Sequence, residues 1–174
     1  ALGAAGRPCP SERLTLAHIG VGGMGSVDLA NLMLIRDESR VNIAAVCDVD
    51  KSRCDKGKEV AEAVYAANEP GGNYKGCAAY NDYRELLARP DIDAVLIATP
   101  DHWHEQMVLD AIAAGKDVYC EKGWTTSIAA AKRMRAAVKK SGTILQLGHQ
   151  GRQHAAADVA RKMLLDGVIG ELTL

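Results

Sequence analysis

The chain has 174 residues, a formal net charge of -1 and 48% hydrophobic residues, which is typical of one globular domain with a real core. The lack of a basic excess argues against nucleic acid as a partner, and no apolar run reaches the roughly 20 residues that a membrane-spanning helix needs. The five cysteines are odd in number and contain no C-x-x-C pair, so they favour core residues over a disulfide framework or a zinc site.

Residues 1–12 precede the first strand pattern. This stretch is rich in small residues and prolines, shows no hydrophobic periodicity and has no initiator Met. It predicts a flexible leader of the kind that remains after an export signal is cleaved, and a trimmed sequence would look the same.

The next stretch alternates apolar residues and then places three glycines, Gly20, Gly22 and Gly25, in the spacing G-x-G-x-x-G before a helical pattern. Gly20 suits a tight turn, Gly22 lets a pyrophosphate approach the backbone, and Gly25 lets helix and strand pack closely. The free N–H groups at the helix start, around Gly23 and Met24, lie at the positive end of the helix dipole and can hold phosphates. The motif therefore predicts a phosphate-binding turn.

A second strand over residues 41–48 ends on Asp48, 23 residues after the last glycine of the motif. A carboxylate at this place accepts both ribose hydroxyls of an adenosine, so the two features together predict a dinucleotide site. Asp48 would also repel a 2′-phosphate, which favours NAD over NADP, while Arg53 nearby keeps NADP as the alternative.

The rest of the chain alternates helical and strand patterns. Helices are predicted over 24–37, 51–67, 82–88, 102–114, 127–140 and 153–165, and strands over 77–80, 93–98, 117–121 and 143–148, with another beginning at 169. The last helix is expected to bury one face, formed by Ala156, Val159, Ala160, Met163 and Leu164. The alternation predicts an α/β fold: a doubly wound, mainly parallel sheet in the order 3-2-1-4-5-6, with its ligand site at the carboxyl ends of the strands.

The polar clusters at these strand ends together resemble the glucose–fructose oxidoreductase, inositol dehydrogenase and MocA (Gfo/Idh/MocA) family over residues 14–174. The resemblance rests on the segments GVGGMG (20–25), ATPDHWH (98–104), GKDVYCEK (115–122) and GHQGR (148–152). It implies an NAD(P)-binding Rossmann domain over residues 13–166. It also implies a second α/β domain that starts at 167–174, is otherwise missing here, and helps to form the substrate pocket.

The resemblance also implies roles for single residues. Thr99, Pro100 and His104 are expected to line the cofactor channel, and Glu121 to contact the nicotinamide ribose. Lys122 is expected beside the nicotinamide and the substrate hydroxyl, where it orients the substrate and relays a proton. A lysine suits this role because burial beside a cationic ring favours its neutral form.

One position departs from the family pattern Glu-Lys-Pro, because here the sequence is Glu121-Lys122-Gly123. Proline would fix the backbone after the lysine, whereas glycine frees it. A subgroup with altered chemistry is therefore one interpretation of this site.

The histidines have separate interpretations. His149, at the end of the sixth strand, is either a catalytic residue of the substrate pocket or a loop residue, and His18, inside the first strand, is expected in the core. His102 and His104 are two residues apart at a helix start and share no face, so no metal site is predicted.

The expected function is that of an NAD(P)-dependent oxidoreductase that transfers hydride between nicotinamide and a hydroxyl-bearing carbon of a sugar or cyclitol. The alternatives are an NAD-dependent glycosidase that acts by transient oxidation, and a cofactor-binding module without catalysis. Expected partners are a sugar or polyol substrate and further copies of the protein, joined through the second domain, with no nucleic acid and no membrane.

Two expectations concern the chain as a whole. The leader resembles what remains of twin-arginine signals in exported relatives, which predicts a periplasmic protein, with a cytoplasmic one as the alternative. Residues 1–174 by themselves are expected to bind NAD weakly and to turn over no polyol, because the family's second domain supplies much of the substrate wall.

Overall fold

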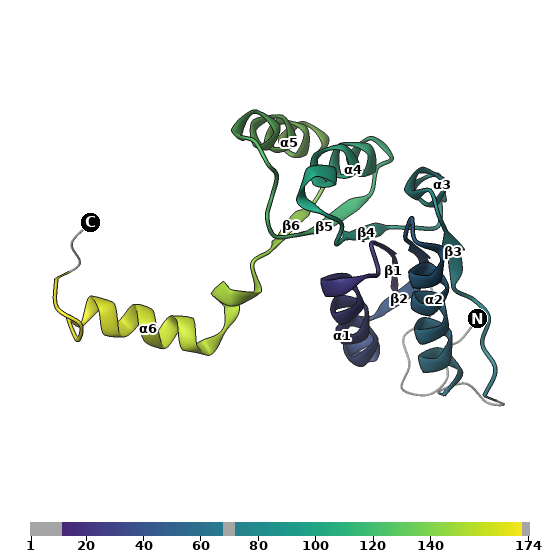
Figure 1. The fold of residues 1–174 in the computed structure, drawn as a ribbon, viewed down its shortest axis with the longest axis horizontal. Helices are drawn as coiled ribbons and strands as arrows, with labels where there is room; N and C mark the ends of the chain where they lie inside the picture. Colours follow the sequence, from purple (N-terminus) through teal and green to yellow (C-terminus); the bar gives the residue numbers. More distant parts are fainter. Residues whose placement is uncertain (1–11, 68–71, 172–174) are drawn as a thin grey trace.

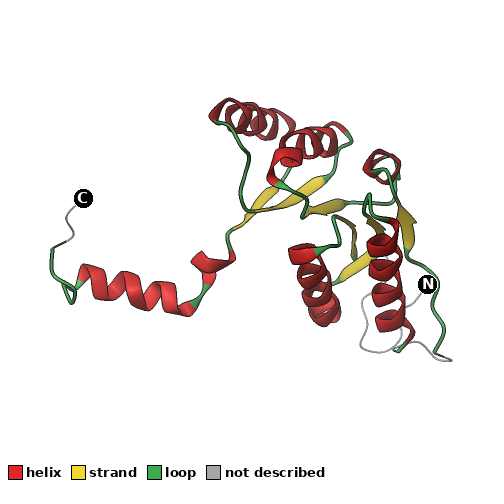
Figure 2. Cartoon of the chain, in the orientation of Figure 1, coloured by secondary structure: helices red, strands yellow, loops and turns green. Residues whose placement is uncertain are grey.

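The fold is a six-stranded parallel sheet with helices on both faces, described by a computed structural model for residues 12–67 and 72–171 (Figure 1 and Figure 2). The strand order is β3-β2-β1-β4-β5-β6, which confirms the predicted doubly wound topology. The strands are β1 (Leu14–Ile19), β2 (Val41–Cys47), β3 (Ala78–Tyr80), β4 (Ala94–Ile97), β5 (Asp117–Glu121) and β6 (Leu145–Gly148). The helices are α1 (Gly23–Ser39), α2 (Lys51–Ala66), α3 (Tyr83–Leu87), α4 (Asp101–Ala113), α5 (Ile128–Ser141) and α6 (Ala155–Leu165), with a 3₁₀ turn over Gln150–Gln153.

Two hydrophobic cores lie on opposite faces of the sheet, because alternate strand residues point to opposite sides. On one face, side chains of β1, β4 and β5 pack against α3, α4 and α5, with Ile97, Val108 and Met134 almost fully buried. On the other face, side chains of β2 pack against α1 and α2 around Leu29 and Ile43. All four residues of β4 are buried, as the continuous apolar run of this central strand predicts.

Capping residues in the sequence mark where the helices begin and end. Asp50 precedes α2 and accepts hydrogen bonds from the N–H groups of Ser52 and Arg53, and Ser127 precedes α5 and accepts one from Ala130. Gly142 ends α5 in the left-handed conformation, at φ 75°. Asp50 and Ser127 thus begin their helices at the carboxyl ends of the strands, where the candidate site lies, and Gly142 turns the chain at the opposite edge of the sheet.

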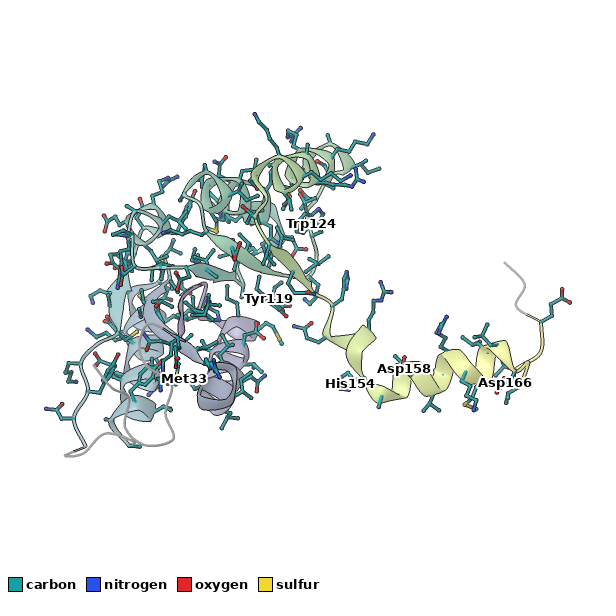
Figure 3. All side chains as sticks on the ribbon, turned by 180° about the vertical axis from the view of Figure 1, so that it is seen from behind. Met33, Tyr119, Trp124, His154, Asp158 and Asp166 are labelled. Carbon is teal, nitrogen blue, oxygen red and sulfur yellow. The ribbon has the colours of Figure 1, made fainter. Side chains whose placement is uncertain are left out.

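The last helix forms as predicted, but its expected burial is wrong. No residue of α6 is buried, and the face formed by Ala156, Val159, Ala160, Met163 and Leu164 is exposed. Figure 1 shows α6 projecting away from the sheet, and Figure 3 places His154, Asp158 and Asp166 along this projecting part, well apart from Met33 and Tyr119. Helical periodicity shows which face is apolar, but it does not supply a surface that covers this face.

Other expectations about the ends of the chain are settled only in part. The strand expected from residue 169 is wrong for residues 169–171, which form a turn and an irregular stretch, and residues 172–174 lie outside the described residues. Residues 1–11 of the expected leader also lie outside them, so the division at 12–13 and 166–167 stays a prediction. Within the described ranges, no helix combines the length and the apolar composition needed to cross a bilayer.

His18 lies in the core, as predicted. Its side chain is fully buried on β1, between Val46 of β2 and Leu96 of β4 in the register of the sheet. Within the described part of the chain, neither ring nitrogen has a hydrogen-bond partner. Burial lowers the pKa of His18 to about 3, because a charged imidazolium loses its hydration there. The ring is therefore neutral in the folded protein at any pH above this value.

This burial predicts a loss of stability in acid. In the unfolded chain His18 binds a proton below its ordinary pKa of about 6.5, while the folded state does not, so stability falls as the pH drops from about 6.5 towards 3. At pH 5 the loss is about 2 kcal/mol. We expect His18→Leu to remove this part of the pH dependence, measured by urea unfolding at pH 7.5 and pH 5.

The matched control is His154→Leu, because His154 is exposed and its substitution leaves the core intact. This variant should show the same acid loss as the unmodified protein. An equal loss in the His18→Leu variant would show that His18 contributes nothing to the pH dependence.

Candidate functional site

A cavity of about 690 Å³ opens at the carboxyl ends of β1, β2 and β4. This is the point where the strand order reverses, since β1 is flanked by β2 on one side and β4 on the other. The cavity is lined by the glycine turn, the end of β2, the start of α3 and the connection from β4 to α4. The lining side chains and glycines include Gly20, Gly22, Gly23, Met24, Asp48, Val49, Arg53, Asp82, Arg84, Thr99, Pro100, Trp103 and Met107.

The glycine turn needs the residues that the motif supplies. Gly20 has φ 87°, and a Cβ on it would lie 2.7 Å from the carbonyl oxygen of Ala98. A Cβ on Gly25 would overlap the carbonyl oxygen of Gly20, so α1 packs against β1 at a distance that only glycine permits. Gly22 faces the flexible end of the Arg53 side chain, 3.0 Å from the built Cβ to Nη1, and not a rigid backbone. The turn thus opens the first N–H groups of α1 towards the cavity.

Asp48 stands beside this turn with its carboxylate held in place. Oδ2 accepts a hydrogen bond from the N–H of Val21 at 3.0 Å, and Oδ1 accepts one from the N–H of Asp50 at 2.9 Å. Each oxygen keeps a second lone pair, so the half-buried carboxylate can still accept hydrogen bonds from two hydroxyl groups of a ligand. This arrangement suits the two adjacent hydroxyls of a ribose.

Thr99 and Pro100 line the cavity, whereas His104 lies behind its wall. The His104 side chain is fully buried and is not among the lining residues. Its Nε2 lies 2.8 Å from the carbonyl oxygen of Thr99, and its Nδ1 lies 2.7 Å from the carbonyl oxygen of Gly123. His104 therefore supports the wall from inside, and its expected direct contact with a cofactor stays a prediction.

Glu121 and Lys122 lie at the same edge of the sheet, at the end of β5, outside the lining of the cavity. The Glu121 side chain is buried, and its Oε1 accepts hydrogen bonds from Tyr119 Oη at 3.2 Å and from Gln150 Nε2. Its other oxygen, Oε2, is buried without a hydrogen-bond partner among the described residues. The Lys122 side chain is exposed, and the Lys122–Gly123 peptide is cis.

Two residues near Glu121 were given no role of their own from the sequence, although Gly148 lies within the segment 148–152 that carries the resemblance. Asp28 of α1 is buried, and its Oδ2 has no hydrogen-bond partner in the ranges that the structure describes. Burial and the charge of Glu121 raise its pKa to about 6, and the charge of Lys122 opposes this rise. Gly148, which ends β6, lies so close that a Cβ on it would be 2.6 Å from both Glu121 Oε1 and Tyr119 Oη. The signal for Asp28 is its position three residues after Gly25, on the helix face turned towards the sheet.

The position of Tyr119 beside Glu121 also changes the pKa of this tyrosine. Burial, followed by the charge of Glu121 and the hydrogen bond to it, raises the pKa of Tyr119 to about 12, so the phenol stays protonated and donates to the carboxylate.

His149 follows β6 at this edge and its side chain is exposed, so its role as a catalytic residue stays a prediction. In the described part of the chain, no three His, Cys, Asp or Glu side chains gather in a way that could hold a metal ion.

Comparison with known proteins agrees with this geometry. Residues 14–149 match the family described as "Oxidoreductase family, NAD-binding Rossmann fold", the Gfo/Idh/MocA family. An inositol 2-dehydrogenase from Rhodococcus jostii (strain RHA1) is 30% identical over 168 residues, which are 94% of this chain and 41% of that protein.

Two solved structures share the fold. A scyllo-inositol dehydrogenase from Lactobacillus casei, with bound NAD(H) and scyllo-inositol, superposes with a TM-score of 0.75 at 22% identity, over 92% of this chain and 43% of the other. A 3-ketoreductase from Actinomadura kijaniata, in complex with TDP-benzene and NADP, has a TM-score of 0.75 at 26% identity, over 91% and 45% of the two chains.

The chain thus spans less than half the length of these relatives. The family match extends from the first strand to the residue after β6, and so includes the glycine turn, Asp48, Thr99, His104 and the Glu121–Lys122 pair. This chain belongs to the Gfo/Idh/MocA oxidoreductase family and contains its NAD-binding Rossmann domain.

Proposed function

We propose that the protein containing this chain is an NAD-dependent dehydrogenase that acts on a hydroxyl group of a sugar or cyclitol. The observation that carries the proposal is the Asp48 carboxylate, held by two backbone N–H groups beside the glycine turn in a cavity at the reversal of strand order. Relatives named as an inositol dehydrogenase and a 3-ketoreductase support the choice of substrate class.

The residues present fit a nicotinamide dinucleotide. Gly22 and the first N–H groups of α1 would hold the pyrophosphate, and Asp48 would accept the ribose hydroxyls of the adenosine. At the other end, Oε2 of Glu121 is a buried acceptor with no partner in the described part of the chain, and a ribose hydroxyl would satisfy it. When bound, the nicotinamide supplies the carbon that accepts or donates hydride.

Lys122 is the residue that moves the proton in this proposal. Oxidation of an alcohol releases a hydroxyl proton as well as a hydride, and an amine beside the reacting carbon can take that proton. Lys122 directly follows Glu121, so both side chains lie at the edge of the sheet that carries the glycine turn. His149, two strands from the cavity at the end of β6, is the second candidate for contact with the substrate.

The choice of NAD over NADP follows from the charge of Asp48. We expect Asp48→Ser to raise the Kd for NAD by roughly tenfold or more, because a charged acceptor is lost, and to change the Kd for NADP less. The measurement is isothermal titration of both cofactors, with Asp55→Ser as the control because Asp55 is exposed on α2 and does not line the cavity. Tighter binding of NADP by the unmodified protein would contradict this role of Asp48.

Loss of Lys122 should lower turnover far more than cofactor binding. In the full-length protein we expect Lys122→Ala to reduce kcat by about a hundredfold, the usual scale for a positioned proton-transfer group. NADH formation on a panel of sugars and cyclitols measures the rate, and Lys140→Ala, in the exposed last turn of α5, is the matched control. Unchanged turnover would show that Lys122 is an ordinary surface lysine. Product release without NADH would indicate a glycosidase that acts by transient oxidation.

A further inference from the structure

We propose that His104 is a positioning residue that holds the Lys122–Gly123 turn against the end of β4 and so sets the direction of Lys122. The proposal rests on the proposed function, because the position of Lys122 matters only if this lysine meets the substrate. It assigns His104 a place behind the cofactor cavity, in contact with the backbone of two loops.

The ring of His104 is fully buried and both nitrogens face backbone carbonyl oxygens. Nδ1 is 2.7 Å from the oxygen of Gly123, and Nε2 is 2.8 Å from the oxygen of Thr99. A carbonyl oxygen only accepts hydrogen bonds, so the ring must donate in either contact. A neutral ring satisfies one carbonyl and a protonated ring satisfies both, and the two contacts involve different nitrogens. They can therefore be removed one at a time.

These two carbonyls belong to two different loops of the site, the one that lines the cavity and the one that carries Lys122. Thr99 follows β4 and lines the cavity, while Gly123 directly follows Lys122 beyond the end of β5. The strands β4 and β5 are parallel neighbours, with Ile97 opposite Cys120. One side chain on α4 thus connects the loop that forms the cofactor wall to the loop that carries the lysine.

The lysine turn depends on this contact because its own sequence constrains it little. Gly123 permits a wide range of backbone angles, and the Lys122 side chain is exposed. Among the described residues, no backbone–backbone hydrogen bond outside the helices and strands involves residues 122–126. The turn also approaches the first turn of α4 at Asp101, whose Oδ2 lies 3.4 Å from a Cβ built on Gly123. The structure therefore restrains the Lys122–Gly123 end of the turn through α4, while Trp124 anchors its other end by packing against the core.

Two substitutions separate the contacts. Asn places its amide nitrogen near the position of the histidine Nδ1, and Gln places it near the position of Nε2. His104→Asn thus offers a donor to Gly123 alone, and His104→Gln offers a donor to Thr99 alone. Both variants lose the ring and leave one buried carbonyl without a donor, and His104→Asn leaves the larger cavity because Asn is one methylene shorter.

In the full-length protein with NAD and its sugar or cyclitol substrate, we expect opposite effects. His104→Gln should lower kcat by roughly tenfold or more, because a small displacement of a catalytic group is costly, with little change in the KM for NAD. His104→Asn should keep most of kcat and raise the KM for NAD, because the Thr99 wall is released. Equal kcat values in the two variants, at equal melting temperatures, would overturn the proposal.

A second measurement does not depend on turnover. Hydrogen–deuterium exchange of the segment 122–126 should be faster in His104→Gln than in His104→Asn, and equal exchange would overturn the proposal. If neither variant folds, ¹⁵N NMR of the His104 ring in the unmodified protein tests the same contacts, and a ring with no hydrogen bond at Nδ1 would overturn it. An unmodified protein without turnover on any sugar or cyclitol would refute the proposed function alone, since the exchange comparison still tests the contact.

Discussion

The close approach of α1 to β1 is the constraint on which the rest of the site depends. It exists because Gly25 has no Cβ and packs against the carbonyl oxygen of Gly20. The same approach places the first N–H groups of α1 at the cavity. It also brings Asp28, one helical turn further on, close enough to Glu121 for their charges to interact. A larger residue at Gly25 would displace the helix, and with it both the N–H groups proposed to hold the pyrophosphate and the buried Asp28.

Asp28 gives the site a charge that depends on pH. Asp28 and Glu121 both lie in the interior, and each has one oxygen that finds no hydrogen-bond partner among residues 12–67 and 72–171. Burial is the larger cause of the raised pKa of Asp28, and the charge of Glu121 adds to it, while Lys122 acts in the opposite direction. With a pKa of about 6, Asp28 changes its charge just below neutral pH, beside the residues proposed to contact the nicotinamide end of the cofactor.

The sheet order and the glycine turn were predictable because they follow from general constraints. Right-handed crossovers leave few arrangements for alternating strands and helices, and the glycine spacing has a steric cause at Gly20 and Gly25. The position of His104 was not predictable, because a motif identifies a loop but does not say whether a ring faces the cavity or the backbone. The burial of Asp28 was hard to predict, since α1 has only a weak separation of polar and apolar faces. The exposed face of α6 shows a similar limit, because periodicity does not reveal the covering surface.

The helix α4 links the two halves of the site. Trp103 and Met107 are four residues apart, so they lie on one face of α4, and both line the cavity. His104 is one residue further round the helix and is directed at the carbonyl oxygens of Thr99 and Gly123. Because one rigid helix supports both the cavity wall and the turn after β5, a shift of α4 would move them together. The missing proline after Lys122 therefore does not leave the turn unsupported: a tertiary hydrogen bond from α4 supplies a restraint that the local sequence lacks.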